Sequence, residues 1–566
     1  MHVSAAGRIR KGYVATSNGQ LHYRSAGQGP VVLLLPEPPR SSSVYTGLMQ
    51  TLADEFTLIA LDLPGYGNTP AFNLPVAPTA SHFAARVAEA LTALGIQRCA
   101  VYGYHGSSKL ALQLAVQQPA KVAVAVLDGL SLPLELPDAQ FLQRYLPPFE
   151  LSDDGSHLTR EWSRLLDAHR FYPWFARSER ARLNASLPDA AQLHGYALDI
   201  LSAATHYAAA PLAIQRCDAR QLLLQAQARI VVTAREDDFL YRALDALPEN
   251  LPANIGVERI RADDEEWRAR LRVIFREHCD RSARAAQPER QTATGAGERC
   301  GYVDLAHGQV HLRCRGGGSK RPLLLLHEAP GSSAQLRPLM QELAAERPVI
   351  AIDLPGLGDS DPVTNPEVAN YKLVLLDLLD SLQVREVDLL AEFTATPLAI
   401  ELARTVPERV HRMILDGVFF FTASERRALR KQFCPPLIPT RDGTHLLALW
   451  QRLRDQELSW PWYDSDRTAV RRRTPDLTAA RLHPMLVDVM KQPAHYGELC
   501  LAAFEYPVKE MLEQLRHPVL LAQTPGDTRY QWVSRAARRL AERSVVNLPP
   551  TIAEQARQWS SFYNAP

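Results

Sequence analysis

The chain has 566 residues, of which 46% are hydrophobic and 22% are charged, and its 63 basic and 62 acidic residues leave a net charge of +1. This composition is typical of a folded globular protein and excludes long disorder, a collagen-like chain and a disulfide scaffold. The balance of charge argues against a dedicated nucleic-acid-binding protein, which needs a basic face. Seven scattered cysteines without a CxxC spacing are typical of reduced thiols, so we expect a cytoplasmic protein.

The start of the chain, Met1 to Lys11, contains no apolar segment of the kind found in signal peptides. No run elsewhere approaches the length of about 18 apolar residues that a membrane-spanning helix needs. We therefore expect no signal peptide, no transmembrane helix and no membrane partner.

The chain contains one internal duplication. Residues 12–24 match residues 301–313, and Ile59-Ala-Leu-Asp-Leu-Pro-Gly-Tyr-Gly matches Ile350-Ala-Ile-Asp-Leu-Pro-Gly-Leu-Gly. Later matches, such as Leu127-Asp-Gly with Leu415-Asp-Gly, keep nearly the same offset. A unit of roughly 270–280 residues is too long for a solenoid repeat, so each copy should fold around its own core.

The duplication sets the predicted domain boundaries. We predict a first domain over residues 1–278, a linker over 279–300 and a second domain over 301–566. The linker segment is polar and has no apolar periodicity, which is typical of a flexible connection. We expect the two domains to pack against each other as an intrachain pseudo-dimer.

Taken in chain order, each copy alternates strand-like and helix-like segments. Short continuous apolar runs at 31–35 and 58–61 recur in the second copy at 323–326 and 349–352. Such runs indicate parallel strands that are buried on both faces. Amphipathic stretches at 81–94 and 367–382 predict helices between them. We therefore predict an α/β fold in each copy, with a mostly parallel sheet flanked by helices.

At these positions the sequence resembles the α/β-hydrolase superfamily. The matching landmarks are a loop after an early strand (36–41 and 327–332), Asp-Leu-Pro-Gly-x-Gly after the next, and a strand-turn-helix at 101–107 and 389–395. The resemblance covers both copies nearly end to end and implies a helical cap over the site, at about residues 130–225 and 418–514. It is specific for the fold and not for an activity, because this fold hosts many reactions.

The turn that carries the nucleophile in active relatives has changed in both copies. Relatives read G-x-S-x-G there, or carry Asp or Cys in place of Ser. The first copy has His105 at that position and the second has Phe393. Asp238 and Asp527 remain where the family acid is expected, but no histidine follows the last strand in either copy. We therefore do not expect Ser-His-Asp hydrolysis.

His105 keeps a group that titrates near neutral pH, so it is a candidate general acid or base. The first copy resembles a subgroup with a Gly-His-His-Thr-Gly turn and a helical cap. Glu37 is its expected catalytic partner, whereas the matching Glu328 would face Phe393. The alternatives remain open: His105 as a turn residue bonded to a carbonyl, and both glutamates as solvated loop carboxylates.

The cap supplies further candidates. We predict that His206 joins the catalytic group and that four other side chains bind substrate: Tyr104, His157, Trp174 and His194. The second-domain counterparts are Glu328, Phe393, His445, His495 and Asp527. These cap histidines can equally bridge helices, and the aromatic residues can equally form the cap core. No ligand spacing points to a metal, so we expect neither metal nor cofactor.

Two functions fit these observations. The first is an enzyme with non-serine acid/base chemistry in the first domain, acting on a small, partly apolar metabolite as a lyase, isomerase, cyclase or histidine-assisted hydrolase. The second is a tandem pseudo-hydrolase that has lost catalysis and binds a ligand or acts as a scaffold. In both cases the expected partner is a small molecule and not a nucleic acid. They differ in whether removal of His105 abolishes turnover.

Overall fold

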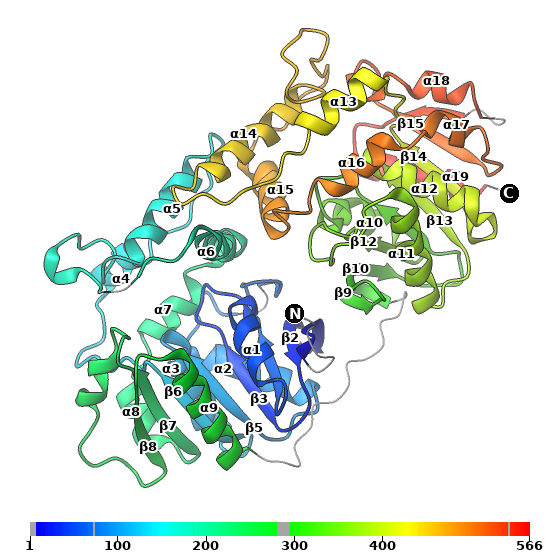
Figure 1. The fold of residues 1–566 in the computed structure, drawn as a ribbon. Helices are drawn as coiled ribbons and strands as arrows, with labels where there is room; N and C mark the ends of the chain where they lie inside the picture. Colours follow the sequence, from blue (N-terminus) through cyan, green and yellow to red (C-terminus); the bar gives the residue numbers. More distant parts are fainter. Residues whose placement is uncertain (1–6, 72–73, 185, 280–294, 541–543, 566) are drawn as a thin grey trace. The chain divides into compact units, whose positions relative to one another are not determined.

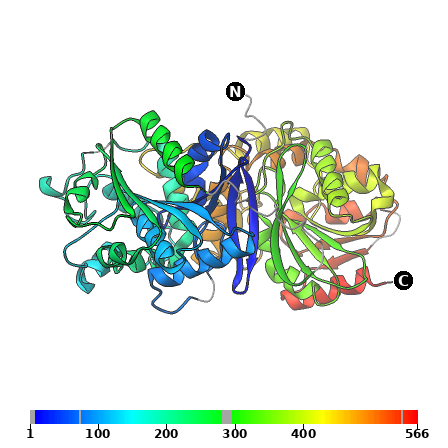
Figure 2. The same ribbon diagram turned by 90° about the horizontal axis from the view of Figure 1, so that it is seen from below.

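The computed structural model describes residues 7–71, 74–184, 186–279, 295–540 and 544–565. The chain divides into two compact units. The first holds residues 1–150 and 159–289, and the second holds 151–158 and 290–566. Each unit contains one eight-stranded sheet. Figures 1 and 2 show each sheet from two directions, with helices on either side of it. Each unit is described by itself below.

The sheet of the first unit has the strand order β1-β2-β4-β3-β5-β6-β7-β8. The first two strands run antiparallel to their neighbours and the others are parallel. The strands are β1 (Arg10–Thr16), β2 (Gly19–Ala26), β3 (Val31–Leu35), β4 (Thr57–Leu61), β5 (Cys99–Tyr104), β6 (Val122–Asp128), β7 (Arg229–Arg235) and β8 (Ile255–Ile260). The helices are α1 (Thr46–Leu52), α2 (Ala80–Ala93), α3 (Gly106–Gln117), α4 (Ala139–Tyr145), α5 (Ser156–Ala168), α6 (Ala190–Ala203), α7 (Ala209–Gln215), α8 (Ala219–Gln225) and α9 (Asp264–His278).

The sheet of the second unit repeats this topology as β9-β10-β12-β11-β13-β14-β15-β16. Its strands are β9 (Gly295–Asp304), β10 (Gln309–Gly316), β11 (Leu323–Leu326), β12 (Val349–Ile352), β13 (Val387–Glu392), β14 (Val410–Asp416), β15 (Val519–Gln523) and β16 (Ser544–Asn547). Its helices are α10 (Arg337–Leu343), α11 (Val368–Ser381), α12 (Thr396–Thr405), α13 (Ala423–Gln432), α14 (Thr444–Leu458), α15 (Ala479–Lys491), α16 (Glu498–Glu505), α17 (Val508–Leu512), α18 (Val533–Ala537) and α19 (Ile552–Tyr563).

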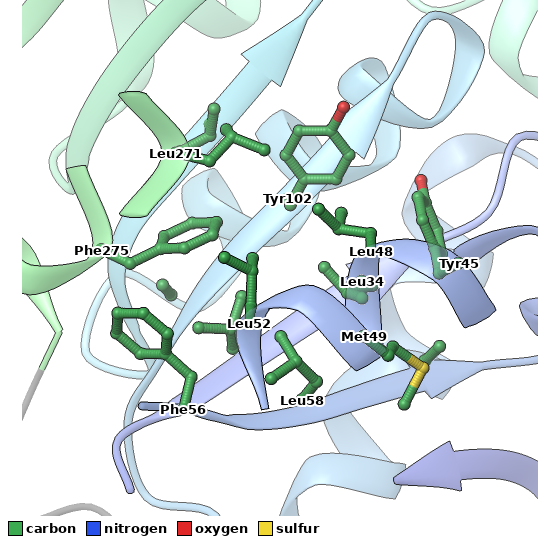
Figure 3. Packing of buried hydrophobic residues seen from close by; sticks show 14 of the residues in the cluster. Leu34, Tyr45, Leu48, Met49, Leu52, Phe56, Leu58, Tyr102, Leu271 and Phe275 are labelled. Carbon is green, nitrogen blue, oxygen red and sulfur yellow. The ribbon is translucent and has the colours of Figure 1, made fainter. Parts of the chain in front are cut away.

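Each sheet has its own hydrophobic core. In the first unit, side chains of the central strands pack under α1 and α9, as Figure 3 shows for Leu34, Leu58, Leu52 and Phe275. The second unit repeats this layer with α10 and α19, where Trp559 is fully buried. All residues of β3 and β11 are buried, which is why their sequences are continuous apolar runs rather than alternating ones. The predicted fold class is confirmed.

The helices between β6 and β7, and between β14 and β15, occupy the segments that the sequence assigned to the caps. We call α4 to α8 the cap of the first unit. The predicted linker needs a correction at its end, because β9 begins at Gly295 and pairs with β10, as in the match of Gly295 with Gly316. Residues 280–294 of that linker lie outside the described residues. The pseudo-dimer stays a prediction.

Among the described helices, none alone has the length and composition to cross a membrane. One bent pair, formed by residues 190–206 and 209–215, passes that test by length and composition only.

Candidate active site

His105 sits at a sharp turn between β5 and α3. Its backbone has φ 48° and ψ −116°, a conformation that costs a residue with a side chain roughly 1–3 kcal/mol. The turn is held by the His105 N–H, which donates to the Asp128 carbonyl at 2.8 Å. Gly103 is required beside it, because a Cβ there would lie 2.4 Å from the Ser107 carbonyl oxygen. The sequence thus keeps a strained turn that lifts one side chain above the sheet.

The His105 ring lies between two carboxylates. Its Nε2 is 2.7 Å from Oδ2 of Asp238, which follows β7, and its Nδ1 is 3.8 Å from Oε2 of Glu37, in the loop after β3. The Tyr104 hydroxyl donates to the same Asp238 oxygen at 3.2 Å, and its ring stacks on the imidazole with centroids 3.7 Å apart. Gly129 leaves room for the ring, since a Cβ there would approach Cδ2 of His105 to 2.5 Å.

This arrangement changes the ionisation of His105 and Asp238. Burial alone favours a neutral His105, but the hydrogen bond to Asp238 and the negative charges of Glu37 and Asp238 outweigh it and raise the His105 pKa. Burial also acts against an ionised Asp238, but the hydrogen bond from His105 outweighs it, so the pKa of Asp238 is lowered. Both shifts favour the same charged pair, an imidazolium beside a carboxylate.

A cavity of about 250 Å³ lies between this turn and the cap. Glu37 and Gly106 form part of its wall on the sheet side. The cap contributes aliphatic side chains, such as Leu165, Ile200 and Ile214, together with aromatic and basic ones: Tyr145, Arg164, His169, Trp174, Tyr196 and Tyr207. The Glu37 side chain is 40% exposed. Its remaining burial raises the Glu37 pKa, against the opposing effects of His105 and the Gly106 amide. The described residues that line the cavity do not include His105. Its Nδ1 lies 3.8 Å from Oε2 of Glu37, which does line the cavity.

The comparisons with known proteins agree with this topology. A model of the alpha/beta hydrolase fold family matches residues 30–241 and 321–433. The chain belongs to the alpha/beta hydrolase fold family. One similar protein is a 2-hydroxymuconate semialdehyde hydrolase of Pseudomonas sp. strain CF600, 37% identical over 108 residues, which are 18% of this chain and 37% of that protein. Another is a putative carbamate hydrolase, RutD, of Escherichia coli O1:K1 / APEC, 34% identical over 97 residues, 17% of this chain and 36% of that protein.

The chain thus spans only about a third of the length of the curated relatives it matches. Among solved structures, a hydrolase from Pseudomonas aeruginosa PA01 is 18% identical and covers 48% of this chain and 100% of its own, with a TM-score of 0.37. An enol-lactonase from Burkholderia xenovorans LB400 is 14% identical and covers 46% of this chain and 96% of its own, with a TM-score of 0.35.

An alpha/beta hydrolase stabilises a negatively charged oxygen with the amide after the turn residue and an amide of the loop after β3. In the first unit, the Gly106 N–H follows His105 and donates instead to Oε1 of Glu37 at 3.1 Å. The loop continues with Pro38 and Pro39, which have no N–H to donate. A carboxylate of the protein therefore takes the position where such an enzyme would hold the oxyanion.

The structure brings some of the predicted site residues together and not others. Asp238 and Tyr104 contact His105, while Glu37 and Trp174 line the cavity. Three cap histidines are elsewhere. His206 is exposed and its Cβ lies near Gly65, and His194 is buried in α6. His157 lies in the first turn of α5, which belongs to the second unit, and its Nε2 is 3.2 Å from Nδ1 of His483. None of the three lines the cavity.

Sequence reasoning missed the basic residues of the cavity wall. Arg40 and Arg164 both line it, together with His169. A signal existed for Arg40, because the loop after the early strand reads Pro-Glu-Pro-Pro-Arg in the first copy and His-Glu-Ala-Pro-Gly in the second. Arg164 lies on α5 and His169 directly follows it, and nothing in the sequence distinguishes them from arginines and histidines on an exposed face.

The second unit fills the equivalent turn with its own side chains. Phe393 is buried, has φ 31° and packs on Trp460 at a centroid distance of 4.8 Å. The Arg529 guanidinium lies 4.9 Å from the centre of the Phe393 ring and donates to Glu328 at 2.6 Å. The Ala329 N–H, in the loop after β11, donates to the Thr394 hydroxyl at 2.6 Å.

The remaining counterparts in the second unit are also occupied by neighbours. Asp527 is buried and accepts hydrogen bonds from Arg471, the shortest at 2.9 Å. His445 bonds Thr440, and Nδ1 of His495 is 3.0 Å from Glu498. Burial raises the pKa of Glu392 to about 8 and that of Asp416 to about 6.

One group in the second unit has metal-ligand geometry. His311, Asp353 and Asp359 offer ligand atoms within 4.8 Å of one another. Their charges are already matched inside the protein, since His311 bonds Asp353 at 2.9 Å and Nζ of Lys491 lies 2.9 Å from Asp359. These residues therefore act as a structural ion-pair cluster.

Proposed function

We propose that the first unit is an enzyme that transfers protons on a small, partly apolar metabolite, with Glu37, His105 and Asp238 as its acid–base group. The observation that supports this most is the position of Glu37. Its carboxylate lines the cavity, accepts from the Gly106 amide at 3.1 Å and lies 3.8 Å from His105. A carboxylate with a raised pKa beside an imidazolium is suited to accept and return a proton near neutral pH.

The cavity lining favours different roles for Glu37 and His105 from those expected from the sequence, where His105 was the general acid or base. Glu37 touches the substrate and moves the proton, because it lines the cavity. His105 acts through Glu37: its positive charge holds the glutamate ionised until a proton is taken up. Asp238 in turn fixes the orientation of the His105 ring and keeps it protonated. The reaction classes that this group serves are elimination, isomerisation, cyclisation and attack by a water that Glu37 deprotonates.

Acyl transfer through a covalent ester is disfavoured by the same contacts. His105 stands where the nucleophile would be, and the Gly106 amide is occupied by Glu37. A tetrahedral oxyanion formed there would face a carboxylate instead of two amide donors, which costs several orders of magnitude in rate.

A second function, ligand binding without turnover, is favoured by the state of the second unit. There Phe393, Thr394 and Arg529 fill the equivalent site, so one copy of this chain has given up the acid–base group while keeping the fold. If the first unit followed the same course, its cavity would bind a metabolite and leave it unchanged.

One experiment separates these functions. The purified chain is incubated in D₂O with metabolite extract from its source, and mass spectrometry follows consumption and deuterium incorporation. We expect the wild type to convert a metabolite, and Glu37→Gln and His105→Ala to lose this activity while circular dichroism shows them folded. Glu328→Gln, at the matching position of the second unit, is the control and should retain activity.

Equal turnover by Glu37→Gln and the wild type would refute the proposed acid–base group. A metabolite retained by the protein without any change of mass would favour the binding function instead.

A further inference from the structure

Arg40 stands out in the cavity wall because most of its guanidinium lacks a protein partner. Its Nε donates to Oδ2 of Asp199 at 2.6 Å, and its plane lies 3.6 Å from the centre of the Tyr196 ring. Within the part of the chain that the structure describes, neither Nη1 nor Nη2 has a hydrogen-bond acceptor. These two groups form the end of a rigid fork whose geometry matches a carboxylate.

The contacts of Arg40 fix this fork in place. Asp199 is buried, and the ring of Tyr196 covers one face of the guanidinium, so the side chain has lost its freedom before any ligand arrives. Preorganised donors bind an anion more tightly than flexible ones because no rotamer entropy remains to be lost. The side chain is still 15% exposed, and it lines the cavity.

The surroundings of Arg40 favour an anion over a neutral ligand. Arg164 on α5 lines the same cavity, and it is held by the Tyr207 hydroxyl at 2.7 Å and by Glu161. His169 lies beside them, and burial together with the Arg40 charge lowers its pKa to about 4, so it is a neutral donor or acceptor. Two arginines and one carboxylate, Glu37, are the charged groups of the wall.

The second copy shows that the fold does not need this arginine. Gly331 stands at the position of Arg40. The aspartate equivalent to Asp199, Asp488, instead accepts from the Ser332 hydroxyl at 2.6 Å, and the sheet keeps the same strand order. Arg40 is therefore present only in the copy that also carries the His105 turn, where it lines the cavity, and that is where a ligand-binding role would place it.

From these contacts we propose that the cavity binds a small carboxylate, whose two oxygens accept hydrogen bonds from Nη1 and Nη2 of Arg40 while its apolar body packs on the aromatic residues of the cap. The cavity has a volume of about 250 Å³, which suits a small molecule. That this carboxylate is a substrate, and not only a ligand, rests on the proposed function.

The same loop fixes which part of the ligand would react. The Arg40 N–H donates to the Glu37 carbonyl at 2.8 Å, so both side chains leave one tight turn. A carboxylate held by Arg40 thus places the atoms next to it near the Glu37 carboxylate. We expect the proton that Glu37 moves to be on an atom close to the carboxylate group of the substrate.

The test uses benzoate as the probe and benzamide, which has the same shape without the charge, as its comparison. Isothermal titration calorimetry is run on the full chain and on three variants: Arg40→Gly, which restores the residue of the second copy, Arg40→Lys, which keeps the charge and removes the fork, and Arg177→Gln, which removes an exposed arginine of the cap outside the cavity.

We expect benzoate to bind the wild type and Arg177→Gln at least about tenfold more tightly than benzamide, and this preference to disappear in Arg40→Gly and fall in Arg40→Lys. Equal binding of the two probes by the wild type, no binding of benzoate, or full benzoate affinity in both Arg40 variants would overturn the inference. If Arg40→Gly fails to fold, Arg40→Lys alone decides. Glu37→Gln separates the two proposals, since it should lose turnover and still bind benzoate.

Discussion

The loop carboxylates Glu37 and Glu328 occupy equivalent positions and meet opposite surroundings. Glu37 faces a histidine and an open cavity, while Glu328 is bound by Arg529 at 2.6 Å. The Glu328 carboxylate is already engaged by a charge-assisted hydrogen bond inside the protein, whereas the Glu37 carboxylate lines the cavity. Under the proposed function, the glutamate would thus transfer protons in one copy and support the structure in the other, because its neighbours differ.

Burial has the largest effect on the His105 pKa and lowers it, and the hydrogen bond to Asp238 is the largest of the effects that raise it, which allows a direct test. In Asp238→Asn the amide can still accept from Nε2, but the negative charge is gone, so the imidazolium loses its partner. We expect the pKa of His105, measured by NMR of the labelled ring, to fall relative to the wild type. Asp237→Asn, at the neighbouring exposed position paired with Arg235, should leave it unchanged.

The same substitution predicts a pH dependence of stability. The raised pKa of His105 contributes stability that is complete below about pH 6.5 and is lost as pH rises through the folded value. The lowered pKa of Asp238 contributes stability above about pH 3.9 that is lost as pH falls through its folded value. Urea unfolding should therefore show the largest deficit of Asp238→Asn between about pH 4 and pH 6.5. A deficit that is the same at pH 9 would contradict the ion pair.

At the scale of elements, the local apolar pattern predicted the strands of each sheet but not the contacts between residues far apart in the chain. The runs at 31–35 and 323–326 are strands β3 and β11 because four or five consecutive apolar residues can be buried only between two layers of helices. The pairing of Arg40 with Asp199 joins residues 159 positions apart, and no periodicity encodes it. The order of the family motifs along the chain identified His105 as the turn residue. The packing of α5 and α6 determines which cap residues surround the cavity, and the sequence does not encode that packing locally.

The contact between the β13–α12 turn and the loop after β11 gives a prediction for the second unit. The Thr394 hydroxyl is fully buried and accepts the Ala329 N–H at 2.6 Å. Thr394→Val keeps the shape and leaves a buried amide without a partner, which costs about 1–3 kcal/mol in the free energy of unfolding. Urea denaturation measures this, and Thr394→Ser, which keeps the hydroxyl, is the control. A loss below about 0.5 kcal/mol for the valine variant would mean that water replaces the hydroxyl.

Across the whole molecule, the two units differ in which ionisable groups surround their equivalent turns. The first unit places one imidazolium between carboxylates, so its pair is most stable when the acid is ionised. The second unit buries Glu392 and Asp416 close to Glu328, and burial is the main cause that raises their pKa values to about 8 and about 6. The charges that face this pair come from Arg529, Glu328 and Asp527 as well as from each other.

Raising the pH should therefore weaken the second unit. A carboxyl whose folded pKa is raised binds more protons in the folded state than in the unfolded one, so stability falls as pH rises from its unfolded value near 4 through its folded value. We expect hydrogen exchange of β13 and β14 to quicken between pH 5 and pH 8, after correction for intrinsic rates. Glu392→Gln cannot ionise and should remove most of this dependence, because Glu392 has the larger shift. If the variant and the wild type lose protection of β13 in parallel, Glu392 is already ionised in the folded chain and its charge is matched by Arg529.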